Sequence, residues 1–427
     1  MQNRLTITLL FVLFIIPIHS SGQKLVNSPF SRFNLGSMEP AGSFRSIGMG
    51  GTGTAFRDNN AIYLTNPASY SSLDTNSFIF DFGLDYSINL LSEGETELFS
   101  DDINFDHLII GFPLAKGLGL AAGVVPVSNG YYKIASSITQ GDPGYDPVTG
   151  GYSEYHAGEG SLSKFFLGSG IMVTKDLSAG INMTVLFGEI KRVNQYYFLD
   201  YYNVYHNNNT ERLQISGLNF DYGLQYSKEI KKDYFINAGA SLSSGKHYNS
   251  EFETVAFSYS AYGSSDTLSY FNDDASSAYL PGTLRLGLAF GKKNKLTAGF
   301  DLVSTEWSKA KFHGADGYLG DTKSYLFGLE YIPDKFSNYS TLKRIEYRIG
   351  GHFADNYLVI DGKQVKEAGV SIGFGLPLRR SFSKTNIFFD FTKKSVSGET
   401  IVINENYFTV GISLNLYDRW FIQRKYD

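Results

Sequence analysis

The feature that most constrains the fold is a strict alternation of apolar and polar side chains that recurs along most of the chain. In NSFIFDFGLDYS the residues of one parity from 78 to 86 are all apolar, namely Phe78, Phe80, Phe82, Leu84 and Tyr86. The same alternation recurs in ISGLNFDYGLQYS and in FTVGISLNL. Because successive side chains of a β-strand point to opposite faces, each segment predicts a strand with one apolar and one polar face.

Fourteen segments of this kind follow one another, and the links between them alternate in length. We place them, to within a few residues, at 76–90, 102–113, 117–133, 158–174, 177–196, 210–229, 233–248, 279–291, 295–305, 322–333, 343–354, 366–377, 385–394 and 404–416. The links after even-numbered segments are mostly short and charged. Those after odd-numbered segments include long ones at 134–157 and 249–278, which we expect to be extracellular loops. This asymmetry is typical of outer-membrane barrels.

Two architectures explain strands with one apolar face. A soluble β-sandwich buries that face inside, whereas a transmembrane barrel turns it toward lipid and keeps the polar face in the lumen. The segments exceed the usual sandwich strand of about 5 or 6 residues, which favours the barrel. We therefore predict an all-β, 14-stranded antiparallel transmembrane β-barrel over residues 76–416, followed by a periplasmic tail at 417–427.

The N-terminus and the composition place the chain outside the cytoplasm. A short charged start, the apolar run Leu5 to Ile18 and the small residues of HSSG predict a secretory signal peptide over 1–22. The run is too short to span a bilayer as a helix. The chain has no Cys, which excludes a disulfide and a lipid-anchored N-terminus. A net charge of −5 gives no nucleic-acid footprint, so no nucleic-acid partner is expected.

Residues 23–75 precede the first strand and show no sustained alternation. A barrel of fourteen strands has a lumen wider than its side chains fill, so we expect this segment to plug it as a hatch. The segment contains GMGGTG, a formal match to the dinucleotide-binding fingerprint at 48–53. No buried strand precedes these glycines, so we attribute them to tight turns and close packing against the barrel wall.

A second pattern follows the glycine run, in GMGGTGTAFRDNNAIYLTNPASY. With YLPGTLRLGLAF and GLAAGVVPVSNG, it resembles the FadL-type outer-membrane transporters of long-chain fatty acids and other hydrophobic compounds. The residues that carry the hatch resemblance are Asp58, Ala61, Asn66, Pro67 and Ala68. The resemblance implies a fourteen-stranded barrel in the outer membrane of a Gram-negative bacterium. It also implies passive uptake through a lumen pocket and a shift of the hatch or a gap in the wall.

A gap in the wall requires an interrupted strand. Pro126, with Asn129 and Gly130 nearby, is the candidate for such a lateral opening, because proline lacks the N–H that a sheet ladder needs. An ordinary β-bulge at the same residues is the alternative interpretation.

The alternation also predicts which charged side chains face the lumen. Residues of the inward parity are Arg285, Asp301, Arg344, Glu346, Arg348 and His352. An inward arginine can bind a substrate carboxylate through two hydrogen bonds. Alternatively, these groups pair with one another or tether the hatch, where Arg45 and Arg57 invite the same comparison.

No pattern predicts an enzyme, a metal site or a cofactor. The seven His residues form no H-x-x-x-H pair, and the formal G-x-S-x-G match from Gly369 to Gly373 lies inside the predicted strand 366–377, not at the strand-to-helix turn of a nucleophile elbow. We predict an outer-membrane channel for passive uptake of hydrophobic small molecules such as long-chain fatty acids, whose partners are membrane lipid and the ligand. The alternative is a structural or adaptor barrel of an outer-membrane secretion or assembly complex, which binds a protein partner through the extracellular loops.

Overall fold

The structure is a computed structural model. It describes residues 28–93, 96–143, 145–200, 204–260, 265–314, 319–378, 381–397 and 402–419. The predicted signal peptide at 1–22 and the end of the predicted tail lie outside these residues.

Short helices and long strands make up the described chain. The helices are η1 (Pro29–Arg32), α2 (Phe44–Ile47), η2 (Pro67–Ser72), η3 (Trp307–Lys309) and α3 (Thr341–Arg344). The strands are β1 (Ser37–Met38), β2 (Ser77–Glu93), β3 (Thr96–Ala115), β4 (Leu118–Asn129), β5 (Tyr132–Ile138), β6 (Tyr152–Met172), β7 (Leu177–Phe198), β8 (His206–Lys231), β9 (Tyr234–Ser243), β10 (Lys246–Tyr259), β11 (Ser265–Leu280), β12 (Thr283–Lys292), β13 (Leu296–Thr305), β14 (Thr322–Tyr331), β15 (Glu346–Ile360), β16 (Lys363–Pro377), β17 (Lys384–Ser397) and β18 (Val402–Arg419).

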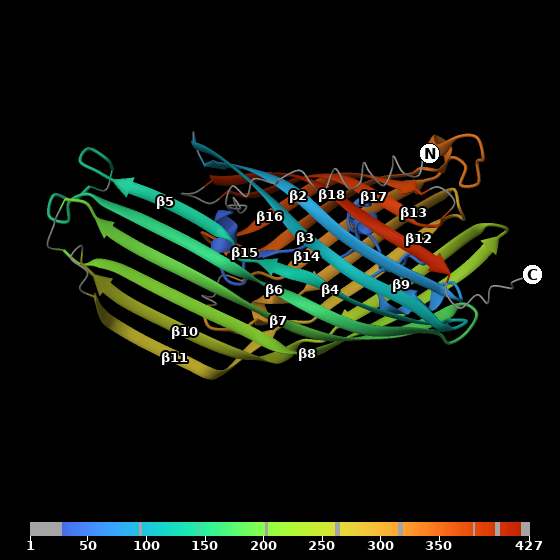
Figure 1. Cartoon of the computed structure of the whole chain (residues 1–427), viewed down its shortest axis with the longest axis horizontal. Helices are drawn as coiled ribbons and strands as arrows, with labels where there is room; N and C mark the ends of the chain where they lie inside the picture. The colour runs from blue at the N-terminus through green and yellow to red at the C-terminus, as the bar shows by residue number, and fades with distance from the viewer. Residues whose placement is uncertain are drawn as a thin grey trace, which may run out of the picture.

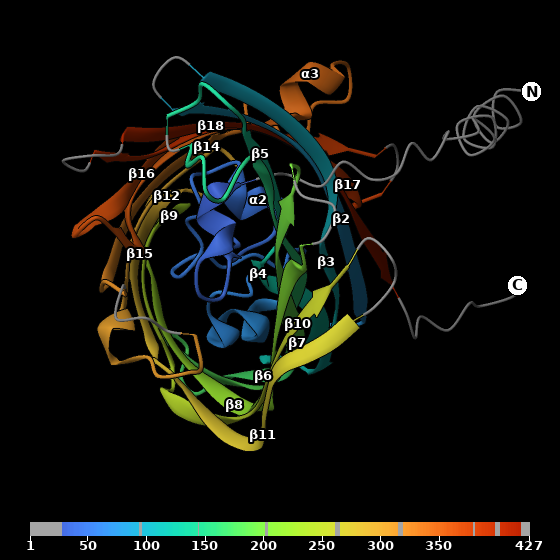
Figure 2. The ribbon, with the colours of Figure 1, turned by 90° about the vertical axis from the view of Figure 1, so that its left-hand side faces the viewer.

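Strands β2 to β18 form one closed antiparallel wall. The barrel has fourteen strands, because three of them are each divided into two labelled segments. β4 and β5 both pair with β6, β9 and β10 both pair with β8, and β11 continues into β12. The ring closes where β18 pairs with β2 (Figures 1 and 2). The prediction of a 14-stranded antiparallel barrel is confirmed. β18 extends to Arg419, so the first residues assigned to the tail belong to the wall.

The apolar parity of the strands faces outward. Leu284, Leu286 and Leu288 of β12 are 43–54% exposed, while Gly287 and Ala289, which have the other parity, are buried. On β8, Tyr222 and Leu224 are exposed, and the polar Gln225 is buried on the lumen side. Such an inside-out arrangement is that of a barrel in lipid and excludes a sandwich with a dry apolar interior.

The long extracellular links differ from the prediction. Residues 134–157 and 249–278 were expected to be loops, but much of both is strand. β5 and β6 pair from Tyr132 to Tyr152, and β10 and β11 form a hairpin beyond the barrel (Figure 1). These segments escaped the prediction because they are polar on both faces, which leaves no alternation to detect.

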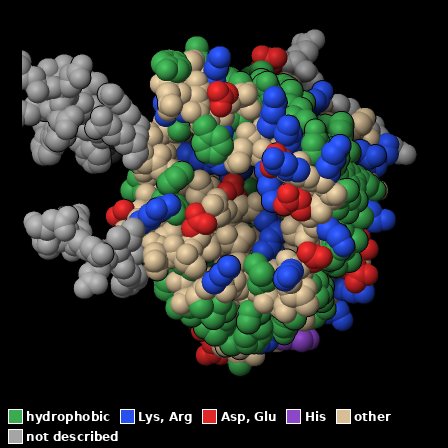
Figure 3. All heavy atoms as spheres, turned by 90° about the vertical axis from the view of Figure 1, so that its right-hand side faces the viewer, with side chains coloured by type: hydrophobic (Ala, Val, Ile, Leu, Met, Phe, Trp, Pro, Cys, Tyr) green, Lys and Arg blue, Asp and Glu red, His purple; other side chains and the backbone are tan. Residues whose placement is uncertain are grey.

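The N-terminal segment, from residue 28 to the start of β2, lies within the ring of strands (Figure 2). We call it the hatch. From the opposite end, apolar side chains cover the flanks, and charged side chains gather at the rim and in the central hollow (Figure 3). No helix in the described ranges is long and apolar enough to cross a membrane.

Candidate functional site

The glycine run of the hatch packs backbone to backbone against glycines of the wall. After α2, Gly50 and Gly51 adopt φ values of +69° and +85°, which favour glycine. A Cβ added to Gly350 of β15 would lie 2.0 Å from the Gly50 nitrogen. The Gly50 N–H donates to Ser371 Oγ at 2.9 Å. The fingerprint-like glycines therefore serve a turn and a close approach.

Asp301 anchors the end of this run. Its Oδ2 accepts hydrogen bonds from the Gly53 and Thr54 N–H groups at 2.8 and 2.9 Å. The side chain belongs to β13 and is buried. The sequence allowed Asp301 to contact either a ligand or the hatch, and in the structure it contacts the hatch.

The Asn66-Pro67-Ala68 motif starts η2 and ties it to the wall. Asn66 Oδ1 accepts from the Ala68 N–H at 3.1 Å, and Pro67 occupies the first turn, where no N–H is needed. Asn66 Nδ2 donates to the carbonyls of Thr54 and Leu224 at 2.9 and 3.1 Å. The side-chain amide of Asn66 thus joins two hatch segments and β8, which accounts for the presence of asparagine at this position.

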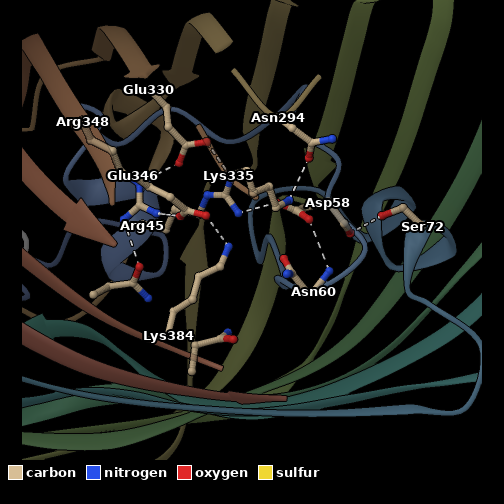
Figure 4. Close-up of polar contacts among 12 residues, drawn as sticks. Arg45, Asp58, Asn60, Ser72, Asn294, Glu330, Lys335, Glu346, Arg348 and Lys384 are labelled. Carbon is tan, nitrogen blue, oxygen red and sulfur yellow. Dashed lines mark hydrogen bonds and ion pairs between the residues drawn. The ribbon is translucent and has the colours of Figure 1, made fainter. Parts of the chain in front are cut away.

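A chain of buried charges links the hatch to three wall strands (Figure 4). Arg45 of α2 contacts Asp58 of the hatch and donates to Glu330 of β14 at 2.8 Å. Arg348 of β15 shares Glu330, also at 2.8 Å, and contacts Glu346. The ammonium group of Lys384 on β17 lies 2.5 Å from Glu346. We call these six residues the charge chain.

Electrostatics keeps the two hatch members of the charge chain ionised. Burial by itself would raise the pKa of Asp58, but the adjacent Arg45 guanidinium, together with Lys384 and Lys335, outweighs burial and holds that pKa well below its ordinary value. Burial would likewise lower the pKa of Arg45, and the Glu330 carboxylate together with the other acidic groups around it more than compensates, so that this pKa is raised. Removing either residue would leave the charge of the other buried without this partner.

Strand β4 is irregular beside Pro126, and hatch residues are bonded to it there. The register of β4 with β6 shifts between Pro126 and Ser128, and the Gly130 N–H donates to Gly160 O at 3.0 Å. Strand β1 pairs with β4 here, Ser37 opposite Asn129. The Glu39 N–H donates to Val127 O at 3.0 Å. Backbone groups of the interrupted strand are therefore bonded by the hatch.

Apolar contacts hold the first part of the hatch. Leu35 inserts into a buried cluster of wall residues inside the mouth, formed by Leu162, Leu186, Ile190, Leu213, Ile215, Tyr248 and Ala278. Phe30 packs in a second cluster, with Tyr357, Leu358, Val365 and Val396. Single polar contacts add to these: Arg192 donates to Arg32 O at 3.0 Å, and Ser28 donates to Glu405 at 2.8 Å.

The remaining predicted residues lie apart from these contacts, and one prediction was wrong. Arg344 does not face the lumen. It belongs to α3, before β15 begins, and its Nη2 donates to Thr341 at 3.4 Å. His352 lies 3.5 Å from Glu367. Arg285 lies in the field of Asp301. Ala61 packs beside the buried cluster of Met49 and Phe56.

Sequence reasoning missed several wall residues that contact the hatch. Glu330 and Lys384 complete the charge chain, and Gln225 Nε2 donates to Thr54 O at 2.9 Å. All three have the inward parity of their strands, so extending the parity analysis to every strand would have found them. The described residues contain no group of three His, Asp or Glu side chains that could hold a metal.

Comparisons with known proteins agree on family and fold. The family model BamG matches residues 1–427. The Pseudomonas putida toluene transporter TodX is similar with a TM-score of 0.59 and 13% identity over 91% of this chain and 100% of TodX. The CymD monoaromatic hydrocarbon channel gives 0.56 and 14% over 90% and 99%.

A Pseudomonas aeruginosa FadL homologue gives a TM-score of 0.56 and 11% identity over 90% of this chain and 99% of the homologue. At identities this low, the similarity to these structures establishes the fold and nothing more. No curated protein matches.

Proposed function

The chain belongs to the BamG family and is a FadL-type barrel of the Gram-negative outer membrane. From that premise, we propose that it works as a plugged adaptor subunit of an outer-membrane assembly or secretion complex. The observation that supports the proposal is that the hatch is bonded to the wall at separate places: at the wall glycines, in the charge chain, and along β4 beside Pro126.

One route by which a solute could leave the lumen leads past the hatch, where it meets the charge chain and the backbone packed on wall glycines. Moving the hatch would separate Arg45 from Glu330 inside a buried network, which typically costs about 3–5 kcal/mol. A second route, through the wall at Pro126, meets the pairing of β1 with β4. A barrel held closed in this way suits a structural role better than continuous conduction.

Purification from native membranes in mild detergent tests this proposal. We expect the tagged full-length protein to elute in a stoichiometric complex with other membrane proteins, and to remain there after a high-salt wash. Recovery of a lone monomer, together with lost uptake of hydrophobic compounds in the deletion strain, would contradict it.

The second candidate is a channel for hydrophobic small molecules, long-chain fatty acids among them. The shared fold with TodX and CymD and the apolar cluster around Leu35, next to the irregular part of β4, favour it. If β1 left the wall, that cluster would border an opening at Pro126. Uptake of labelled fatty acids and toluene by deletion and complemented strains measures this directly, and unchanged uptake of both would exclude the candidate.

A further inference from the structure

Strand β11 has one paired edge and one open edge. It pairs with β10 from Ser265 to Leu280. On its other side, among the described residues, Tyr279 and Lys311 form an isolated bridge and His313 Nε2 lies 3.0 Å from Asp273 Oδ2, but no strand pairs with residues 265–272. Alternate residues of an edge strand direct their N–H and C=O groups away from the sheet, where another chain can bond them.

This edge lies beyond the lipid. β12, which continues β11 after Leu280, has ten residues, about the number that a tilted strand needs to span the hydrocarbon layer. β10 and β11 therefore rise into the extracellular space (Figure 1). Leu268 and Tyr270 are both 60% exposed there, and Phe271 is 48% exposed. Exposed aromatic groups of this kind are enriched at protein interfaces.

The edge lacks the usual protection against pairing and is acidic. Natural edge strands carry Lys or Pro, but residues 265–280 contain no Lys, Arg or Pro. They contain Asp266, Asp273 and Asp274. Two copies joined at this edge would bring like charges together, so the complementary occupant is a basic segment.

A cavity of about 390 Å³ lies at the foot of the hairpin, where the register of β10 and β11 shifts. Its lining is polar and includes Gln214, Ser216, Asn249, Glu251 and Asp274. Gln214 has the opposite parity to Leu213 and Ile215, which face the interior of the mouth, so the cavity opens outward. Two carboxylates in a cavity of this size suit the end of a Lys or Arg side chain.

We propose that β11 is the docking edge for an extended, basic segment of a partner polypeptide. The segment adds a strand to the sheet and inserts a Lys or Arg side chain between Glu251 and Asp274. This inference rests on the proposed function, since it names the surface through which the adaptor binds its partner.

Photo-crosslinking tests the docking edge in the full-length protein in living cells. p-Benzoylphenylalanine replaces Tyr270 or Leu268, and mass spectrometry locates the cross-linked residues. We expect both positions to cross-link one stretch of another protein that contains Lys or Arg. Cross-links to a second copy or to lipopolysaccharide alone, or none at either position, would overturn the proposal.

A charge-removing variant tests the cavity separately. E251Q/D274N keeps the shape of both side chains and should lower the cross-link yield about tenfold. D142N, in an exposed turn at the other end of the extracellular sheet, should leave the yield unchanged. An unchanged yield in E251Q/D274N would overturn the docking mode. If the complex still co-purifies while β11 fails to cross-link, this inference fails and the proposed function stands.

Discussion

The two parts of the hatch contact the same barrel wall through different interactions. Residues 44–72 pack backbone against wall glycines, enter the charge chain and also fill apolar clusters, whereas residues 28–41 have Phe30 and Leu35 in apolar clusters and the short pairing of β1 with β4. Only the 44–72 part contains buried ion pairs, and breaking them leaves buried charges unpaired. The comparison teaches that the glycine-loop part is locked, and that any movement should begin in the first part.

The largest effect is expected from Arg348→Met, because it removes the cation that Glu330 and Glu346 share and leaves the three buried acids of the charge chain with only two cations, Arg45 and Lys384. We expect a loss of about 3–5 kcal/mol in the free energy of unfolding. Hydrogen exchange should rise over residues 44–58 and stay unchanged over 28–39. The matched control is Arg212→Met, which removes an exposed pair with Glu189 and should cost less than about 1 kcal/mol. Equal losses in both variants would contradict the locked part.

Leu35→Ala probes the apolar part. Removing a buried leucine from a packed cluster should cost about 2–4 kcal/mol. Limited proteolysis should then cut within residues 28–41 and spare 44–72. Leu342→Ala, at a leucine that is 68% exposed, is the control and should change neither quantity. If cleavage spread over the whole hatch at once, the two parts would be one cooperative unit.

Gly350→Ala probes the backbone contact. The new methyl group would lie 2.0 Å from the Gly50 nitrogen, so the hatch must shift at a cost of about 1–3 kcal/mol. The neighbouring Gly351 has only one atom within 4 Å of an added Cβ, at 3.5 Å. Thermal unfolding in detergent should therefore separate Gly350→Ala from Gly351→Ala, and equal midpoints would refute the close approach.

The smallest effect is a pH dependence in the first part. Burial, and then the Asp85 carboxylate, raise the pKa of Glu39 to about 8. Because the pKa of Glu39 is raised in the folded state, the folded protein holds this proton more tightly than the unfolded chain does. The free energy of unfolding therefore falls as pH rises from about 4.3, the pKa in the unfolded chain, through about 8. Proteolysis of residues 28–41 should accelerate from pH 6 to pH 9, and Glu39→Gln should flatten this profile. A flat wild-type profile would contradict the raised pKa.

The alternation of side chains that the bilayer imposes could be predicted from the sequence. The contacts between residues far apart in the chain mostly could not. Lipid on one side forces a period of two, which is why the parity of Leu286 and Gly287 was predictable. The hairpin of β10 and β11 was not, because it lies beyond the lipid, where no apolar solvent imposes an alternation on its outer face. The parity of Arg348 was readable, but its link to Arg45 joins residues far apart in the chain. Arg344 failed because the parity rule was applied beyond the end of the strand, into α3.

A cross-link between β1 and the wall tests most directly whether the hatch stays in place while the protein works. The chain has no native Cys, and Met38 and Ser128 are paired residues, whose Cα separation suits a disulfide. We predict that oxidised M38C/S128C retains full complex recovery and unchanged uptake of labelled fatty acids. Uptake that falls on oxidation and returns on reduction would show that β1 must leave the wall, which would contradict a permanently plugged barrel.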